Sequence, residues 1–176
     1  MIGLIEPSCL RGKFAMSLLF TSLRAFIYMC GFIFLWGWIA MGVRAYDRQI
    51  GLVMPAWTPL PGIILVIAGG LLTLLCVGTF VGRGKGTAAP FDAPRQFVAT
   101  GPYRYVRNPM YIGAWFVLIG FGFLECSVSI VVFSIVWILG AHAFVVFVEE
   151  PGLGARFGES YTEYKKSVSR WLPRRK

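Results

Sequence analysis

Charged and metal-binding side chains are scarce in this chain, and their scarcity excludes several classes of protein. Only 14% of the 176 residues are charged and one is histidine, whereas 57% are apolar. So large an apolar fraction excludes an ordinary soluble domain, although the length suits one domain. The four cysteines show neither zinc-finger nor C-x-x-C spacing, and no second histidine lies at ligand spacing. We therefore expect no metal site and expect the cysteines to pack in the core or face lipid.

A nucleotide P-loop is also missing. The glycine-rich stretch at 82–86 contains Arg83 and Lys85 but lacks the spacing of that motif. Its glycines can present backbone N–H groups to an anion, or the stretch can be a flexible basic exit from a helix. The residues leave both interpretations open.

What the chain does have is long apolar runs, at 25–43, 63–81, 109–124 and 126–148. At ~1.5 Å per helical residue, the third run is marginal for a hydrocarbon core of about 30 Å, and the others are long enough. We predict an all-α, polytopic membrane bundle of about four transmembrane helices in a single domain covering 1–176. The second run contains Gly69 and Gly70 and leads to Gly78 and Gly82, whose small-xxx-small spacing favours close helix packing.

The net charge of +9 invites a nucleic-acid interpretation, but its distribution contradicts one. With four spans, fifteen of the seventeen basic residues fall on one side of the membrane, and only Arg44 and Arg48 fall on the other. This is the positive-inside pattern, which places both termini in the cytoplasm. Segments 82–108 and 149–176 then lie on the cytoplasmic face, and we expect no nucleic-acid partner.

Two polar clusters flank the last two apolar runs. Asn108 can cap a helix and Pro109 suits its first position, while Glu149 and Glu150 follow the fourth run. A tight turn at 125–127 makes the two runs antiparallel neighbours. Both clusters then meet at one membrane face, and charged groups converging beside hydrocarbon indicate a site.

The segment from Pro151 onward has a helical apolar stripe, formed by Leu153, Phe157, Tyr161, Tyr164, Val168 and Trp171. Lys165, Lys166 and Arg170 lie off this stripe. We predict a C-terminal amphipathic interfacial helix, which lies on the membrane or caps the site.

The polar clusters offer complementary groups for S-adenosylmethionine. Arg104 and Arg107 suit a carboxylate, the paired glutamates suit an ammonium or ribose hydroxyls, and aromatic faces suit a sulfonium or adenine. Nucleotide phosphates would also suit the arginines. Simpler interpretations are a solvated end to the fourth run for the glutamates, topogenic charges for the arginines and interfacial anchors for the tyrosines. His142 either bonds the backbone of a neighbouring helix or lines a pocket.

Several separated motifs resemble the membrane methyltransferases that include isoprenylcysteine carboxyl methyltransferase and the phospholipid N-methyltransferases. They are the run from Gly101 to Gly113, Glu149-Glu150-Pro-Gly-Leu153, Phe157-Gly-Glu-Ser-Tyr161 with Tyr164, and Arg170-Trp-Leu-Pro-Arg174. The similarity is to bacterial members, which implies the bacterial inner membrane. It also implies a helical membrane fold and transfer of the S-adenosylmethionine methyl group to a lipophilic acceptor.

The resemblance also assigns residues. It associates Arg107, Pro109, Tyr111 and Gly113 with cofactor binding and matches Glu149 and Glu150 to the paired glutamates of the family. From the chemistry of the residues themselves we add Tyr103, Arg104, Asn108 and His142 as cofactor-binding candidates, and we expect catalytic roles for Arg107 and Glu150. Four of these match an R-H-P-x-Y-x-G element, but Asn108 stands where the family has histidine. Asparagine cannot titrate, so an amine acceptor would need Glu150 or His142 as its base, whereas a carboxylate acceptor needs none.

The acceptor is left open among an isoprenylcysteine-type carboxylate, a phospholipid amine and another isoprenoid. The expected partners are the bilayer and this acceptor, with no oligomeric state predicted. Two other functions fit the sequence less well, an NADPH-dependent sterol-type reductase and a non-catalytic membrane scaffold.

Overall fold

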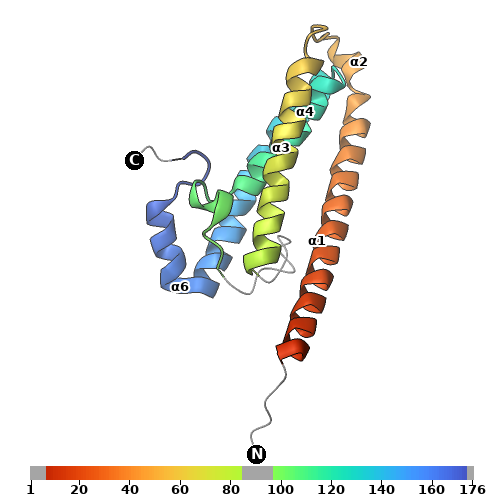
Figure 1. Cartoon of the computed structure of the whole chain (residues 1–176). Coiled ribbons are helices and arrows are strands. Elements are labelled where there is room, and N and C mark those ends of the chain that lie inside the picture. Colours follow the sequence, from red (N-terminus) through yellow and green to blue (C-terminus); the bar gives the residue numbers. More distant parts are fainter. Residues whose placement is uncertain (1–6, 85–96, 174–176) are drawn as a thin grey trace, which may run out of the picture.

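The computed structural model describes residues 7–84 and 97–173, and within these ranges it is helical (Figure 1). Its α-helices are α1 (Pro7–Arg44), α2 (Asp47–Ile50), α3 (Pro59–Thr79), α4 (Pro109–Leu124), α5 (Val128–Phe144) and α6 (Glu150–Ser167). Two π-helical turns, η1 (Phe80–Gly84) and η4 (Val145–Glu149), and the 3-10 turn η3 (Gly101–Arg104) complete the order. The glycine-rich stretch at 82–86, for which an anion-binding role was left open, lies partly outside the described residues.

Three helical stretches are long and apolar enough to cross a membrane, namely Leu18–Ile50, Pro59–Arg83 and Val128–Ser167. Helix α4 is apolar but shorter, with 16 residues or about 24 Å of helix. The first span was predicted at 25–43, and the structure extends it into one continuous helix, α1, of 38 residues. The chain is therefore an all-helical integral membrane protein.

Glycines bring α3 and α4 into close contact. A Cβ added to Gly69 would lie 2.5 Å from the Gly113 carbonyl oxygen, and one on Gly62 would lie 2.9 Å from that of Gly120. Neither contact leaves room for a side chain, so the two backbones pack directly against each other. The close approach predicted from the spacing of Gly78 and Gly82 is wrong, because an added Cβ at either position meets nothing within 4 Å among the described residues. The helices approach at Gly62 and Gly69 instead.

The predicted hairpin between the last two apolar runs is confirmed (Figure 1). Cys126 turns the chain with φ 48°, and the Oγ of the buried Ser127 accepts a hydrogen bond from the Ile130 N–H at 3.2 Å. This side-chain cap begins α5 directly after the turn. The hairpin carries the start of α4 and the end of α5 to the same end of the molecule.

Polar contacts tie the far end of α1 to the same hairpin. Arg44 forms an ion pair with Glu125 at 2.6 Å, and Asp47 Oδ1 accepts from the Ser129 N–H at 2.8 Å. Along the apolar length, the Trp36 ring packs edge-on against Trp137 of α5, with centroids 5.8 Å apart. These contacts anchor α1 to α5.

Beyond α5 the chain bends back toward α4. The π-helical turn η4 carries it into α6, which is interrupted at Gly158 by a left-handed φ of 54°. Much of the predicted apolar stripe packs together in one cluster, which consists of Leu153, Phe157, Tyr161, Tyr164 and Val168 with Phe97 and Ala99. The prediction is wrong at its end, because the helix stops at Ser167 and Trp171 contacts Tyr111 and His142 instead. The stripe thus covers the chain segment that leads into η3. The interfacial position of α6 stays a prediction.

Candidate functional site

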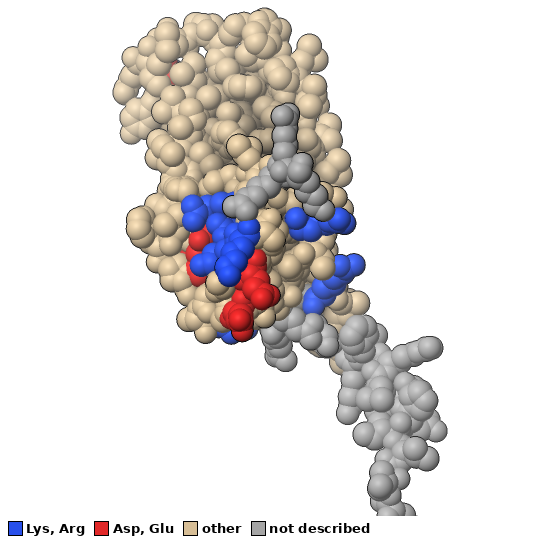
Figure 2. Space-filling model, turned by 90° about the vertical axis from the view of Figure 1, so that its left-hand side faces the viewer, with Lys and Arg blue, Asp and Glu red and all other residues tan. Residues whose placement is uncertain are grey.

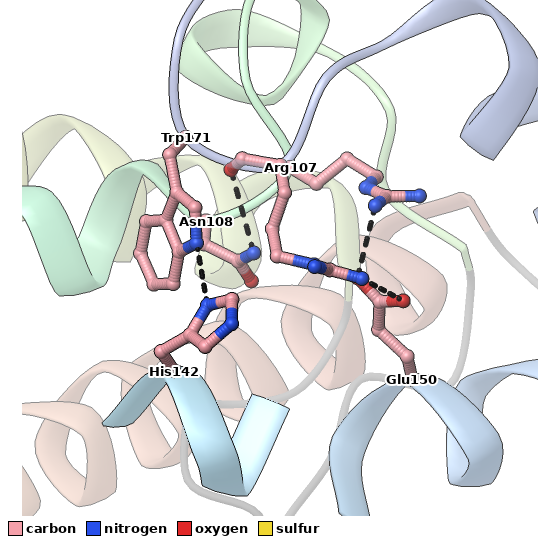
Figure 3. Close-up of polar contacts among 6 residues, drawn as sticks. Arg107, Asn108, His142, Glu150 and Trp171 are labelled. Carbon is pink, nitrogen blue, oxygen red and sulfur yellow. Dashed lines mark hydrogen bonds and ion pairs between the residues drawn. The ribbon is translucent and has the colours of Figure 1, made fainter. Parts of the chain in front are cut away.

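The two polar clusters that flank the last two apolar runs meet where α5 passes into α6 (Figure 3). Glu149 is the last residue of η4 and Glu150 the first of α6, while Arg107 precedes α4 by two residues. Arg107 lies 3.0 Å from Glu150, and their side chains are only 11% and 12% exposed. The hairpin therefore produces the convergence that the sequence predicted.

Glu150 accepts from two arginines at once. Its Oε1 faces the Arg107 guanidinium, and Arg170 donates from Nε to Oε1 at 2.8 Å and from a terminal nitrogen to Oε2 at 3.0 Å. The fork-shaped contact fixes the plane of the carboxylate. It also raises the pKa of Arg170 above its ordinary value, so this guanidinium stays charged. Sequence reasoning did not place Arg170 in the site, although it belongs to one of the motifs that carry the resemblance.

A short C-terminal strap, residues 168–172, brings Arg170 to this position. Val106 and Ser169 form a single parallel bridge, in which the Arg107 N–H donates to the Ser169 carbonyl at 2.8 Å. One residue further along, the Asn108 N–H donates to the Arg170 carbonyl at 3.3 Å. The strap therefore lies across the entry to α4, and its backbone fixes the residues that begin that helix.

Asn108 occupies the N-cap position of α4 but does not cap the helix with its side chain, so that prediction is wrong. Its side-chain N–H donates to the Arg170 carbonyl at 3.4 Å instead. Asn108 is only 7% exposed, so its buried amide N–H needs a protein acceptor, and the strap supplies the Arg170 carbonyl. Pro109, buried at the first helical position, begins the helix as predicted.

Tyr111 connects the start of α4 to the second glutamate. Its hydroxyl donates to Glu149 Oε2 at 2.8 Å, which holds that carboxylate beside the first turn of the helix. The Tyr111 ring also lies edge-on to Trp171 of the strap, with centroids 6.4 Å apart. Tyr111 thus touches both the carboxylate and the strap.

His142 bonds a side chain of the strap rather than a helix backbone. The Trp171 indole N–H donates to His142 Nδ1 at 2.9 Å (Figure 3). His142 also lines an apolar groove between α4 and α5, which agrees with the pocket interpretation of this residue. Between His142 and Glu149 the π-helical turn η4 changes the helical register.

Three further predicted site residues make other contacts. Tyr103 is buried against Phe80, and burial raises the pKa of its phenol well above the ordinary value, so the phenol stays neutral. Arg104 is exposed, with its guanidinium over the Tyr105 ring. Gly113 forms the close contact with α3, where an added Cβ would lie 2.5 Å from Thr73 Oγ1. Their cofactor roles stay predictions.

Charge on the face shown in Figure 2 gathers at one end, where acidic and basic side chains lie side by side below a long stretch with almost no charge. A band of apolar surface next to a charged end is the surface expected of a protein standing in a bilayer, with the charged end in water. The fold and the charged cluster thus define a class, a helical membrane protein with buried charged side chains at one end of its helices.

The model of the phospholipid methyltransferase family matches residues 57–160, more than half of the chain. The chain belongs to this family, and is therefore a membrane methyltransferase that acts on lipid. The match includes the start of α4 and both glutamates but ends before the strap. A search of curated proteins gave no match.

Proposed function

We propose that the chain transfers the methyl group of S-adenosylmethionine to a lipophilic acceptor at the cytoplasmic membrane face. One observation carries the choice of cofactor. The Nε of Arg107 is buried and has no hydrogen-bond partner among the described residues, although the same guanidinium already pairs with Glu150. A buried donor left unpaired is costly, and a carboxylate such as that of S-adenosylmethionine would satisfy it.

The surrounding residues complement the rest of that cofactor. Glu149, already positioned by Tyr111, suits the ammonium group or the ribose hydroxyls, and the Tyr111 ring suits the sulfonium. Glu150 holds Arg107 in place and is itself held by Arg170. When bound, S-adenosylmethionine supplies a methyl group that is already activated, so positioning dominates the catalysis.

The proposed reaction does not need these residues to act as a general base. Glu150 is engaged by two arginines and the Nδ1 lone pair of His142 by Trp171, so neither is a free base in this arrangement. An amine acceptor would lose its proton to water at the membrane face before reacting, and a carboxylate acceptor needs no deprotonation. Asn108, which cannot titrate, takes no part in proton transfer.

We further propose four membrane spans, in which α4 crosses the membrane in addition to the three longer helical stretches, with both termini in the cytoplasm of a bacterial cell. Helix α4 falls short of the hydrocarbon core by only a few ångströms on a helical rise of ~1.5 Å per residue. Helix α3 packs closely against α4 through the glycine contacts. Helix α6 lies at the cytoplasmic interface.

The test uses purified protein in nanodiscs of native membrane lipids with methyl-labelled S-adenosylmethionine. We expect label in the lipid fraction, and mass spectrometry then identifies the acceptor. Calorimetric titration with S-adenosylmethionine and with NADPH separates this proposal from the reductase. Tighter binding of NADPH, or binding of neither compound, would contradict the proposal.

A further inference from the structure

A second groove lies on the surface of α3, at the end where that helix passes into η1. It follows the chain from Leu74 to Arg83 and is bounded by Gly101 of η3. Its volume is about 530 Å³, within the range of small-molecule pockets. None of its lining residues belongs to the contacts of the two glutamates or to the strap. The groove is therefore separate from the candidate site.

The floor of this groove is bare helix backbone. An added Cβ at Gly78 or Gly82 meets nothing within 4 Å among the described residues, so the spacing that favours a neighbouring helix stays open. Gly101 forms the opposite wall. Its φ is 62°, and an added Cβ would lie 2.8 Å from Thr79 Oγ1, so only glycine lets η3 lie this close to α3.

The two ends of the groove differ in polarity. Leu74 and Leu75 are 53% and 62% exposed, and they belong to a stretch long and apolar enough to cross a membrane. Arg83 lies at the other end and is exposed, and its guanidinium forms no ion pair or hydrogen bond within the part of the chain that the structure describes. A groove that passes from hydrocarbon to an unpaired cation suits an amphiphile with an anionic headgroup.

Thr79 adds a requirement for the headgroup. Its hydroxyl donates its one hydrogen to the Leu75 carbonyl at 2.7 Å, so toward the groove this oxygen can only accept. The dipole of α3 places partial negative charge at the same end, which means that Arg83 must supply the attraction for an anion. A headgroup with hydroxyl donors next to its phosphate satisfies both Thr79 and Arg83.

We propose that the groove binds phosphatidylglycerol as a lipid distinct from the methyl acceptor. Its phosphate pairs with Arg83 and a headgroup hydroxyl donates to Thr79 Oγ1. One acyl chain lies over Gly78 and continues along Leu74 and Leu75. A second copy of the chain packed through the same glycines would bring two Arg83 side chains toward each other, and like charges oppose that contact. Phosphatidylglycerol has neither an amine nor a carboxylate to methylate, so this site does not depend on the proposed function.

The experiment offers the purified protein in detergent an equimolar mixture of phosphatidylglycerol and phosphatidylcholine with identical acyl chains. Native mass spectrometry then measures how much of each lipid the protein retains. Neither lipid has an amine that can still accept a methyl group. We expect the wild-type protein to retain phosphatidylglycerol roughly two- to fivefold better, the ratio that one exposed ion pair provides. Equal retention of the two lipids would overturn the inference.

Substitutions at the polar end test the headgroup contacts. Arg83→Gln should abolish the preference for phosphatidylglycerol, whereas Arg156→Gln, which removes the same charge from an exposed arginine of α6, should keep it. Thr79→Val keeps the shape of the side chain and should lower retention of phosphatidylglycerol only. An equal loss in the two arginine variants would show a general attraction to basic surface and contradict the site.

Substitutions at two glycines of α3 test the groove itself. Gly78→Leu fills the groove and should reduce retention of both lipids. Gly70→Leu should not, because Gly70 also has nothing within 4 Å of an added Cβ but does not line the groove. Retention of phosphatidylglycerol by Gly78→Leu at the wild-type level would contradict the proposal. So would a wild-type dimer that has no lipid preference and that Gly78→Leu converts to a monomer, since the groove would then belong to a second copy of the chain.

Discussion

Arg107 and Glu150 are both almost fully buried at the charged end of the molecule. Taking two charges out of water costs free energy that their attraction regains only when the geometry is good and the remaining donors are satisfied. Arg170 supplies a second partner for Glu150, but within the part of the chain that the structure describes the Arg107 Nε has no hydrogen-bond partner. The pair is thus incomplete on the arginine side, which is where we place the carboxylate of the cofactor.

Removing the charge of Glu150 should weaken cofactor binding. Glu150→Gln keeps the shape of the side chain but loses charge-assisted hydrogen bonds, each of which contributes about 1.5–3 kcal/mol. Arg107 then loses its fixed position, so we expect the affinity for S-adenosylmethionine to fall roughly tenfold or more. Calorimetry in detergent measures the change. The matched control is Glu163→Gln, an exposed glutamate on α6, which should bind as the wild type does; equal affinities in the two variants would remove Glu150 from the site.

Substitutions at Asn108 test whether its side chain stabilises the protein by capping α4 or by its hydrogen bond to the strap. Aspartate is as good an N-cap as asparagine, but its carboxylate cannot donate to the Arg170 carbonyl. If the strap contact matters, Asn108→Asp and Asn108→Ala should both lower the melting temperature, with a loss of ~1 kcal/mol for the hydrogen bond. A wild-type melting temperature for Asn108→Asp together with a loss for Asn108→Ala would show that capping is the role after all.

At the scale of elements, the sequence correctly predicts those structural features that depend on local sequence pattern. The start of α4 at Pro109 and the turn at 125–127 follow from local chemistry, and both are confirmed. Three features depend instead on contacts between distant residues or on a local change of helix type. These are the strap bound to 106–108, the π-helical turn after α5 and the bend at Gly158. For that reason Arg170 and Trp171 were not predicted as site residues, whereas the meeting of Arg107 with Glu150 was.

The contact between α3 and α4 depends on individual glycines. Gly69→Ala would place a Cβ against the backbone of α4, which cannot move away as a flexible side chain can, so we expect the variant to lose roughly 1–3 kcal/mol or more of stability. The adjacent Gly70→Ala meets nothing within 4 Å and should be neutral or slightly stabilising, because alanine favours a helix by about 0.5–1 kcal/mol. Thermal melts in detergent compare the two. Equal melting temperatures would contradict the close packing of these helices.

At the scale of the whole molecule, the two ends differ in what they present. The end with the 125–127 turn carries few charges, and two of them, Arg44 and Glu125, are paired with each other. The opposite end carries the arginines and glutamates of the candidate site and α6. Because basic residues are retained on the cytoplasmic side of a membrane, this asymmetry sets the orientation that we propose and places the site within reach of a water-soluble methyl donor.

Cysteine labelling of intact cells tests that orientation. Cys9, Cys30 and Cys126 are first replaced by serine, and Cys76 is kept because it is fully buried in the core. A membrane-impermeant maleimide should then label Ile50→Cys, an exposed position at the end of α2, and should reach Glu163→Cys on α6 only after the cells are opened. The two positions lie at opposite ends of the helical bundle, so four spans with both termini inside require opposite labelling. Labelling of Glu163→Cys in intact cells would place the candidate site outside the cytoplasm, away from the methyl donor that the proposed reaction needs.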